Sequence, residues 1–142
     1  MIDKAALQRV REEGDLFELI AAIPYAKTLG MSCERFGDDM IFTLPPRDTN
    51  LGNPILPAIH GGVIGGFMEM SAGLYLMLQQ DAPKLPRIVD FSIDFLRAGL
   101  NRSTFAECRL TRQGNRVANV TVWCWQKSRQ EPTATARAHF IL

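Results

Sequence analysis

The chain has 142 residues, of which 46% are hydrophobic and 22% charged, with a formal net charge of +1. These values are typical of one globular domain, which we expect over residues 1–142, and the scattered basic residues argue against a nucleic-acid partner. The N-terminus lacks the apolar core of a signal peptide. The cysteines fit neither a disulfide framework nor a metal site, so we expect a cytoplasmic protein with buried, reduced thiols at Cys33, Cys108 and Cys124.

Two helices are predicted at the start of the chain. Residues 3–13 are amphipathic, with Asp3 as the candidate N-cap. A second, short helix over residues 16–22 ends before Pro24, because proline favours a helix boundary. We therefore expect residues 1–22 to form a helical extension of the domain.

A hairpin and a loop follow this extension. Residues 31–45 predict two short strands around a turn at residues 37–39. Residues 45–59 contain four prolines, which predict an irregular loop.

The second half of the chain changes from a helical to an alternating pattern. Residues 61–80 are apolar nearly all round, which predicts a buried helix. Alternating segments then predict strands over residues 87–98, 104–112 and 133–142, and residues 117–127 are strand-like on both faces, as in a central strand. A single apolar helix needs something to wrap it, so the order of elements favours an α+β fold with a six-stranded, curved antiparallel sheet around the long central helix.

The length of this helix raises the question of a membrane span. Glu69 lies near its centre, where a charged side chain costs about 2.5–3.5 kcal/mol on insertion scales. We therefore expect a core helix and no membrane contact.

Most positions next to Glu69 on the predicted helix are glycines, which have no side chain. On a helix, its neighbours one turn away include Gly65, Gly66 and Gly73, and Gly62 lies two turns back. Three interior glycines cost roughly 3 kcal/mol relative to alanines, which is typical of close approach by a ligand or another backbone. The stripe is consistent with a tight packing face or with a carboxylate in a partly desolvated slot, where it serves as a general base.

The sequence His60-Gly61-Gly62 precedes the helix, where backbone N–H groups are unpaired and a substrate oxygen can approach glycine closely. This pattern is a candidate oxyanion hole. His60 and Glu69 are nine residues apart, which is about 13–14 Å along a helix and on opposite sides of it. One chain cannot aim both at the same atom, so a catalytic site needs two subunits related by a two-fold axis.

These residues resemble the PaaI-like branch of the hotdog-fold thioesterases. The family pattern is an asparagine-containing loop, a histidine with two glycines, and an acid nine residues after the histidine, here Asn53, His60-Gly61-Gly62 and Glu69. The segments "VDFSIDFLRAG" and "ATARAHFIL" are similar to family strands, and "IPYAKTLGM" is similar to the lead into the first strand. The resemblance covers about residues 20–142.

The resemblance implies hydrolysis of acyl-CoA or acyl-carrier thioesters at a dimer interface. It makes the Gly61 N–H the oxyanion donor and Glu69 of the second subunit the general base or nucleophile, with Asn53 and His60 orienting the water and the loop. Gly62, Gly65, Gly66, Gly73 and Arg97 are the candidate substrate-binding residues. The implied assembly is a homodimer that pairs into a homotetramer, with no metal and no cofactor apart from the coenzyme A of the substrate.

Two features depart from the family pattern. Asn53 lies seven residues before the histidine, where relatives often have six. Some relatives carry a threonine or serine one turn after the acid, whereas this chain has Gly73, with Ser71 as the nearest hydroxyl.

Two other functions fit the same fold. Hydroxyacyl-thioester dehydratases also combine a histidine with a carboxylate, but their histidine lies in an HFPG-type loop that this chain lacks. A non-catalytic acyl-thioester-binding protein would keep the fold without needing Glu69.

Overall fold

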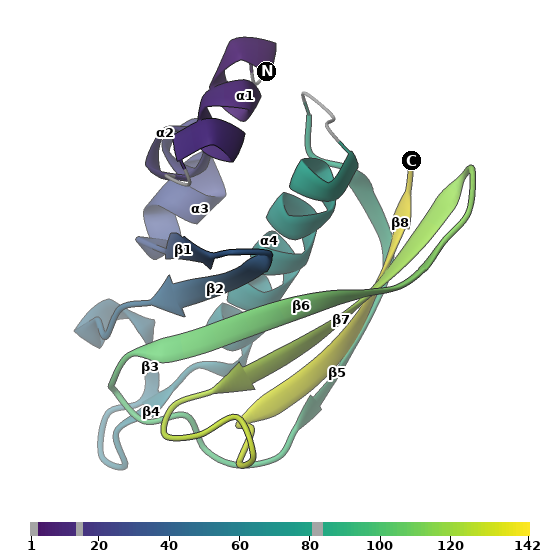
Figure 1. Ribbon diagram of the computed structural model, residues 1–142. Helices are drawn as coiled ribbons and strands as arrows, with labels where there is room; N and C mark the ends of the chain where they lie inside the picture. Colours follow the sequence, from purple (N-terminus) through teal and green to yellow (C-terminus); the bar gives the residue numbers. More distant parts are fainter. Residues whose placement is uncertain (1–2, 14–15, 81–83) are drawn as a thin grey trace.

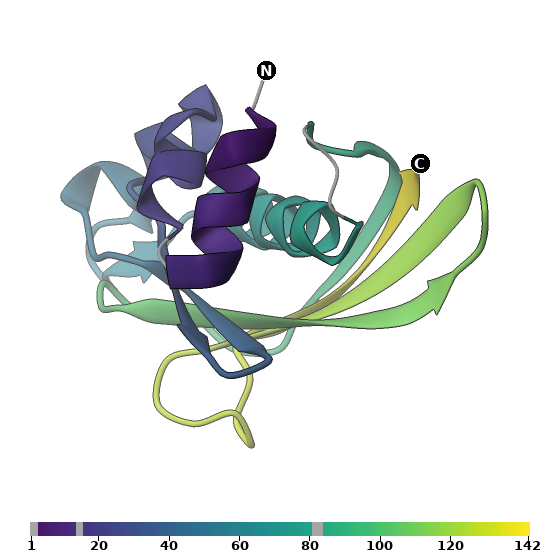
Figure 2. The same ribbon diagram turned by 45° about the horizontal axis from the view of Figure 1, so that its top comes forward.

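The computed structural model describes residues 3–13, 16–80 and 84–142. The long helix α4 (Gly61–Gln80) lies against the concave face of a curved antiparallel sheet (Figures 1 and 2). The sheet has six strands in the order β1-β2-β6-β7-β8-β5. The predicted α+β class, with a six-stranded sheet around one central helix, is confirmed.

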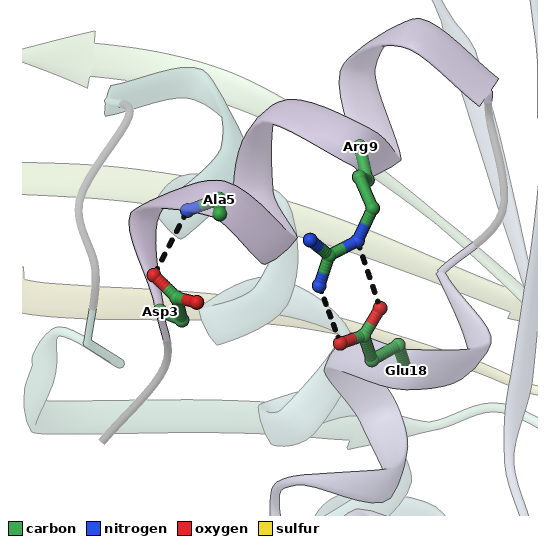
Figure 3. Close-up of polar contacts among 4 residues, drawn as sticks. All are labelled: Asp3, Ala5, Arg9 and Glu18. Atoms are coloured by element: carbon green, nitrogen blue, oxygen red, sulfur yellow. Dashed lines mark hydrogen bonds and ion pairs between the residues drawn. The ribbon is translucent and has the colours of Figure 1, made fainter.

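The helical extension begins with α1 (Lys4–Glu13) and α2 (Phe17–Ala21). Asp3 caps α1 as predicted, because its Oδ1 accepts a hydrogen bond of 3.0 Å from the Ala5 N–H. Arg9 of α1 forms a bidentate ion pair with Glu18 of α2, with an Nη2 to Oε1 distance of 2.6 Å (Figure 3). The two helices are therefore tied together by an exposed contact as well as by their apolar faces.

A third helix, α3 (Pro24–Leu29), was not predicted. The second helix ends before Pro24 as predicted, and Pro24 also begins α3, since proline fits the first helical turn, where its missing N–H is not needed. Gly30 ends α3 with a left-handed φ of 69°. Tyr25 of α3 is thereby placed against Gly66 of α4, a contact that the sequence alone does not reveal.

The predicted hairpin consists of β1 (Ser32–Phe36) and β2 (Asp39–Leu44), with Gly37 at a φ of 64° in the turn. The segment predicted as an irregular loop is more ordered than expected. It contains a 3-10 turn (Asp48–Asn50) and a two-stranded ribbon of β3 (Leu51–Asn53) and β4 (Ala58–Ile59). This ribbon leads directly into α4.

The core lies between α4 and the inner face of the sheet. The buried apolar residues of α4 pack against the small inner residues of β7 (Val117–Trp125) and β8 (Ala134–Ile141). Ala134, Ala136, Ala138 and Phe140 share one buried face of β8, as predicted. α4 is long and apolar enough to cross a membrane, but it is the core helix of this fold.

Two strands depart from regular pairing. In β5 (Arg87–Phe95) the register shifts between Ile88 and Asp90, and in β6 (Thr104–Gln113) it shifts between Leu110 and Arg112. At the second irregularity, the Leu110 N–H donates a 3.2 Å hydrogen bond to the hydroxyl of Tyr75, which belongs to α4. The helix is thus joined to the sheet by a polar contact within an apolar core.

The two edges of the sheet differ in their cover. Helices α2 and α3 lie beside the β1 edge (Figure 1). The β5 edge exposes large apolar side chains, with Val89, Phe95 and the adjoining Leu96 each more than half exposed.

The outer face of the sheet carries two tryptophans beneath arginines. Arg109 lies 5.5 Å from the ring centre of Trp123, and Arg129 lies 5.5 Å from that of Trp125. Arg129 also forms a 2.6 Å ion pair with Glu107, which is otherwise largely buried. This face combines aromatic and charged groups, unlike the apolar inner face.

Candidate active site

His60 caps the start of α4. Its Nδ1 accepts a 2.9 Å hydrogen bond from the Gly62 N–H, and its carbonyl accepts from the N–H groups of Val63 and Ile64 at 2.9 and 3.2 Å. Among the described residues, no hydrogen bond engages the N–H of Gly61. The helix start therefore leaves one backbone donor available, at the residue that the sequence predicted.

The backbone around His60 is fixed by close packing. The His60 N–H donates to the Asn50 carbonyl at 2.8 Å, and the Ile59 N–H donates to the Gly99 carbonyl at 2.7 Å. A Cβ atom added to Gly52 would lie 3.0 Å from the Cα of His60. The ribbon before α4 and the segment after β5 thus hold the helix start from two sides.

Gly61 and Gly62 are glycines for different steric reasons. A Cβ atom at Gly62 would lie 3.0 Å from His60 Nδ1, in the path of the capping hydrogen bond. A Cβ atom at Gly61 would lie 3.2 Å from the ring of Phe95, which comes from the end of β5. A side chain at Gly62 would therefore displace the cap, whereas one at Gly61 would crowd the neighbouring aromatic ring.

Asn53 holds the turn before the helix. Its Oδ1 accepts hydrogen bonds from the N–H groups of Ile55 and Leu56, at 3.0 and 3.2 Å. This turn contains the cis peptide bond between Leu56 and Pro57. Asn53 therefore closes the turn that lies between β3 and β4.

Glu69 is half-buried on α4, and the glycines around it are covered by side chains from other elements. The hydroxyl of Tyr25, from α3, occupies the place that a Cβ atom of Gly66 would take. A Cβ atom on Gly65 would lie 3.9 Å from the ring of Phe91, from β5. Aromatic side chains from two other elements therefore lie over the glycine stripe.

Gly73, on the other side of Glu69, is enclosed by side chains of the same chain. A Cβ atom on Gly73 would lie 3.2 Å from Leu85 and 4.0 Å from Phe140. Gly73 itself is buried, so its missing side chain is replaced by packing within the chain. Of the glycines predicted to bind substrate, Gly73 is thus the one enclosed by the core.

Ser71 is not available to position water. Its side chain is fully buried, and its hydroxyl donates a 2.8 Å hydrogen bond to the Phe67 carbonyl within the helix. No residue of α4 one turn from Glu69 supplies a polar side chain, because these positions hold Gly65, Gly66, Ala72 and Gly73.

Arg97 lies in a shallow basic cleft of about 220 Å³ close to the helix start. Arg102 and Lys127 line the same cleft with Glu131. The adjoining Gly99 carbonyl accepts the Ile59 N–H, which joins this segment to the ribbon before α4. The cleft therefore presents three cations and one carboxylate beside the loop that carries Asn53.

The remaining titratable candidates have structural surroundings. Burial raises the pKa of Cys33 to about 12 and that of Cys124 to about 11, and it raises the pKa of Cys108 well above its usual range. His139 lies 3.6 Å from Asp90 on the strand opposite. Among the described residues, no cluster of His, Cys, Asp and Glu suits a metal ion.

The structure thus gathers Asn53, His60, Gly61 and Gly62 at one end of α4, with Arg97 close by. Glu69 lies eight residues beyond Gly61, which is about 12 Å along the helix axis. The sequence analysis missed Tyr25 and Phe95 as parts of this region, since they meet α4 only through the tertiary fold.

The comparisons with known proteins agree with this fold. A thioesterase superfamily model matches residues 56–133. The chain is 28% identical to the medium/long-chain acyl-CoA thioesterase YigI of Escherichia coli K12, over 82% of this chain and 83% of that protein. A crystal structure from Chromobacterium violaceum is 41% identical, with a TM-score of 0.77 over 96% of this chain and 95% of the other.

A more distant structure shares the fold. The phenylacetic acid degradation-related protein of Ralstonia eutropha is 21% identical, with a TM-score of 0.74 over 84% of this chain and 89% of the other. Since the family model matches more than half of the chain, this protein belongs to the thioesterase superfamily. It is a hotdog-fold thioester hydrolase, and the predicted fold and enzyme class are confirmed.

Proposed function

We propose that the protein hydrolyses acyl-CoA or acyl-carrier thioesters at sites formed by two copies of the chain. In each site, the Gly61 N–H of one copy binds the thioester oxygen, and Glu69 of the second copy activates the attacking group. The observation that carries this proposal is the unengaged Gly61 N–H beside a fully capped helix start. The relative YigI, which is a medium/long-chain acyl-CoA thioesterase, supports acyl-CoA as the substrate class.

The chemistry follows from these two groups. As a water oxygen bonds to the thioester carbon, negative charge develops on the carbonyl oxygen, and the Gly61 N–H at the positive end of the helix dipole stabilises it. Glu69 takes the proton of the water, the carbon–sulfur bond breaks, and the proton passes to the leaving thiolate. Alternatively, Glu69 attacks the thioester carbon, the carbon–sulfur bond breaks and the thiolate leaves, and water then hydrolyses the resulting mixed anhydride.

An isotope measurement detects the anhydride route. In a single turnover in ¹⁸O-water, water that attacks the glutamyl carbon of the anhydride leaves the label on Glu69, whereas water that attacks the acyl carbon leaves it in the product acid. Label on Glu69 is therefore specific to the anhydride route. The general-base route places the label only in the product acid. Mass spectrometry of the peptide that contains Glu69 reads the outcome.

The two-copy arrangement is supported by distance and by exposed surface. Gly61 and Glu69 are about 12 Å apart along one helix, which is too far for both to act on one thioester carbon. The unpaired β5 edge, with Val89 and Phe95 exposed, is suited to pairing with a second β5. The aromatic outer face around Trp123 is our candidate contact for the pairing of two dimers.

Arg97, Arg102 and Lys127 are proposed to bind the phosphates of coenzyme A, because the two guanidinium groups match phosphate oxygens in pairs and the lysine ammonium adds a third positive charge. The reaction needs no metal and no cofactor, since coenzyme A is part of the substrate. The three free thiols, of which Cys108 and Cys124 are buried and Cys33 is half-buried, are consistent with a reducing compartment, and we propose the cytoplasm.

The central experiment removes each catalytic group separately. Glu69→Ala is expected to reduce acyl-CoA hydrolysis by 10² to 10⁴-fold, as measured by thiol release. Gly61→Pro removes the proposed oxyanion donor at a position where proline fits a helix, and is expected to cost roughly 10²- to 10³-fold. Gly61→Ala is the matched control, because it adds a Cβ atom at the same place but keeps the N–H.

Mixing tests whether the site joins two chains. A heterodimer of one Gly61→Pro chain and one Glu69→Ala chain contains one site with both intact groups if the groups act across the interface. Activity should therefore return on mixing. A mixture that stays inactive would exclude the cross-subunit site, and full activity of Glu69→Ala alone would exclude Glu69 as the base or nucleophile.

A further inference from the structure

We propose that Tyr25 is a positioning residue that orients the water activated by Glu69, and that Gly66 is a glycine because it seats the Tyr25 hydroxyl. This inference rests on the proposed function of Glu69. It concerns a residue from a helix that lies outside the sequence pattern of the site.

The first observation is the place of the hydroxyl. The Tyr25 oxygen occupies the volume that a Cβ atom of Gly66 would fill, and the ring carbon Cζ lies 2.9 Å from the same point. The hydroxyl therefore stands where a side chain of α4 would begin. Among the described residues, no hydrogen bond engages this hydroxyl.

The second observation is the spacing along α4. Gly66 precedes Glu69 by three residues, and helix side chains at this spacing have Cβ atoms about 5–6 Å apart. Because the Tyr25 oxygen stands in for the Cβ atom of Gly66, it lies within the span of one bridging water from the Glu69 carboxylate. Tyr25 is 46% exposed, so water reaches this side chain.

The third observation is that, near Glu69, α4 itself provides no other polar side chain that could orient the water. The other positions one turn from Glu69 are Gly65, Ala72 and Gly73, and the nearest hydroxyl, that of Ser71, is bonded to the Phe67 carbonyl. An attacking water must donate one hydrogen to Glu69 and keep a lone pair directed at the thioester carbon. The phenol oxygen is placed to accept the second hydrogen, which fixes the remaining direction.

The test uses two substitutions that remove the hydroxyl from this place in different ways. Tyr25→Phe deletes only the oxygen and keeps the ring. Gly66→Ala keeps the oxygen but displaces it, because the new Cβ atom would overlap a half-exposed side chain that can swing outward. Each is expected to lower kcat about tenfold with an unchanged KM, as the loss of one hydrogen bond in the transition state predicts.

Two combinations separate positioning from packing. The double variant Tyr25→Phe/Gly66→Ala should be no slower than either single variant, because both remove the same contact. In a Glu69→Gln background, Tyr25→Phe should have no further effect on the residual rate. Thermal unfolding of each variant, compared with the wild type, shows whether the fold is retained.

The outcomes are distinct. Wild-type kcat in Tyr25→Phe beside a strongly impaired Glu69→Gln variant would overturn this inference alone. A loss confined to KM, or a tenfold loss that persists in the Glu69→Gln background, would also overturn it. Full turnover in Glu69→Gln would overturn the proposed function, and this inference with it.

Discussion

The two halves of α4 are both apolar, but they are packed in different ways. The first half, residues 61–69, contains four glycines, and its buried side chains are Ile64, Phe67 and Met68. The second half, residues 70–80, contains one glycine and is buried over most of its length, including Leu74, Leu76 and Met77. One helix thus combines an open segment, which carries the candidate site, with a closed segment that fills the core.

This difference assigns different tasks to neighbouring turns. Glycines in the first half give up helix propensity and packing, and they admit Tyr25, Phe91 and the proposed substrate. The second half supplies buried apolar surface that the first half lacks. Substitutions in the second half should therefore change stability, whereas those in the first half should change turnover.

The largest expected effect is in the core half. Leu74 is fully buried, so Leu74→Ala should lower the free energy of unfolding by about 2–5 kcal/mol. Urea unfolding measures the loss, and turnover per folded molecule should remain near that of the wild type. The exposed Gln79→Ala, in the same half, is the control and should change stability by less than about 0.5 kcal/mol. A loss below 1 kcal/mol for Leu74→Ala would contradict the comparison.

The next effect is at the helix start. Gly62→Ala places a methyl group 3.0 Å from His60 Nδ1 and should disturb the cap that orients the Gly61 N–H. Turnover is expected to fall about 10²-fold, because small displacements of an aligned group are costly. Stability should change little, since alanine gains about 1 kcal/mol in helix propensity while the lost cap costs a similar amount.

Gly114→Ala provides the matched control for this variant. Gly114 lies in the β6–β7 connection, where an added Cβ atom would make an ordinary contact of 3.6 Å with Val117. Its steady-state kinetics should match those of the wild type. Equal turnover in Gly62→Ala and Gly114→Ala would show that the cap does not shape the site.

A smaller effect is expected at Ser71, which lies beside Glu69 in sequence but belongs to the core. Ser71→Ala removes a buried hydroxyl together with its bond to the Phe67 carbonyl, and should change stability by about 1 kcal/mol or less. Because the hydroxyl points into the helix, kcat should be unchanged. A kcat reduced more than threefold would place Ser71 in the site and move the boundary between the halves.

The smallest expected effect tests whether water reaches the core beside the second half of α4. Cys108 lies two residues before Leu110, which bonds to Tyr75 of this half, and burial raises the pKa of the Cys108 thiol well above its usual range. Between pH 7 and 8.5 the unfolded thiol begins to lose its proton, whereas the folded one keeps it. Stability should therefore fall with rising pH, by about 0.4 kcal/mol for this thiol.

Urea unfolding at the two pH values measures this change, with Cys108→Ala as the control. The variant should lose about 0.4 kcal/mol less than the wild type over the same interval. An identical pH dependence in both proteins would show that Cys108 is accessible to water in the folded state.

Much of the fold follows from local patterns. The long helix, its N-terminal histidine and the alternation in β8 are visible in the sequence because each depends on neighbouring residues. The helix α3 was missed because Pro24 favours both the end of one helix and the start of another. The short β3–β4 ribbon was missed because its prolines obscure the few paired residues between them.

The site was less predictable from the sequence than the fold. The glycine stripe indicates that something approaches α4 near Glu69, but the sequence does not show that Tyr25 and Leu85 cover parts of it. Likewise, an unpaired N–H at Gly61 depends on how His60 distributes its two acceptors, which is a matter of geometry. Contacts between distant segments account for most of what the sequence left open.

The hydrogen bond between Tyr75 and Leu110 has a consequence for the angular setting of α4. Apolar contacts hold a helix in place without a strong preference for one rotation about its axis, because the hydrophobic effect is not directional. A hydrogen bond, in contrast, depends on the angle between donor and acceptor. A slip of one residue would turn the helix by about 100° and move Glu69 relative to Tyr25 and Phe91, which lie over the neighbouring glycines. The Tyr75 hydroxyl lies nearly two turns from Glu69 on the same helix. Its hydrogen bond to the sheet therefore sets the rotation of α4 about its axis, and with it the direction of the Glu69 side chain.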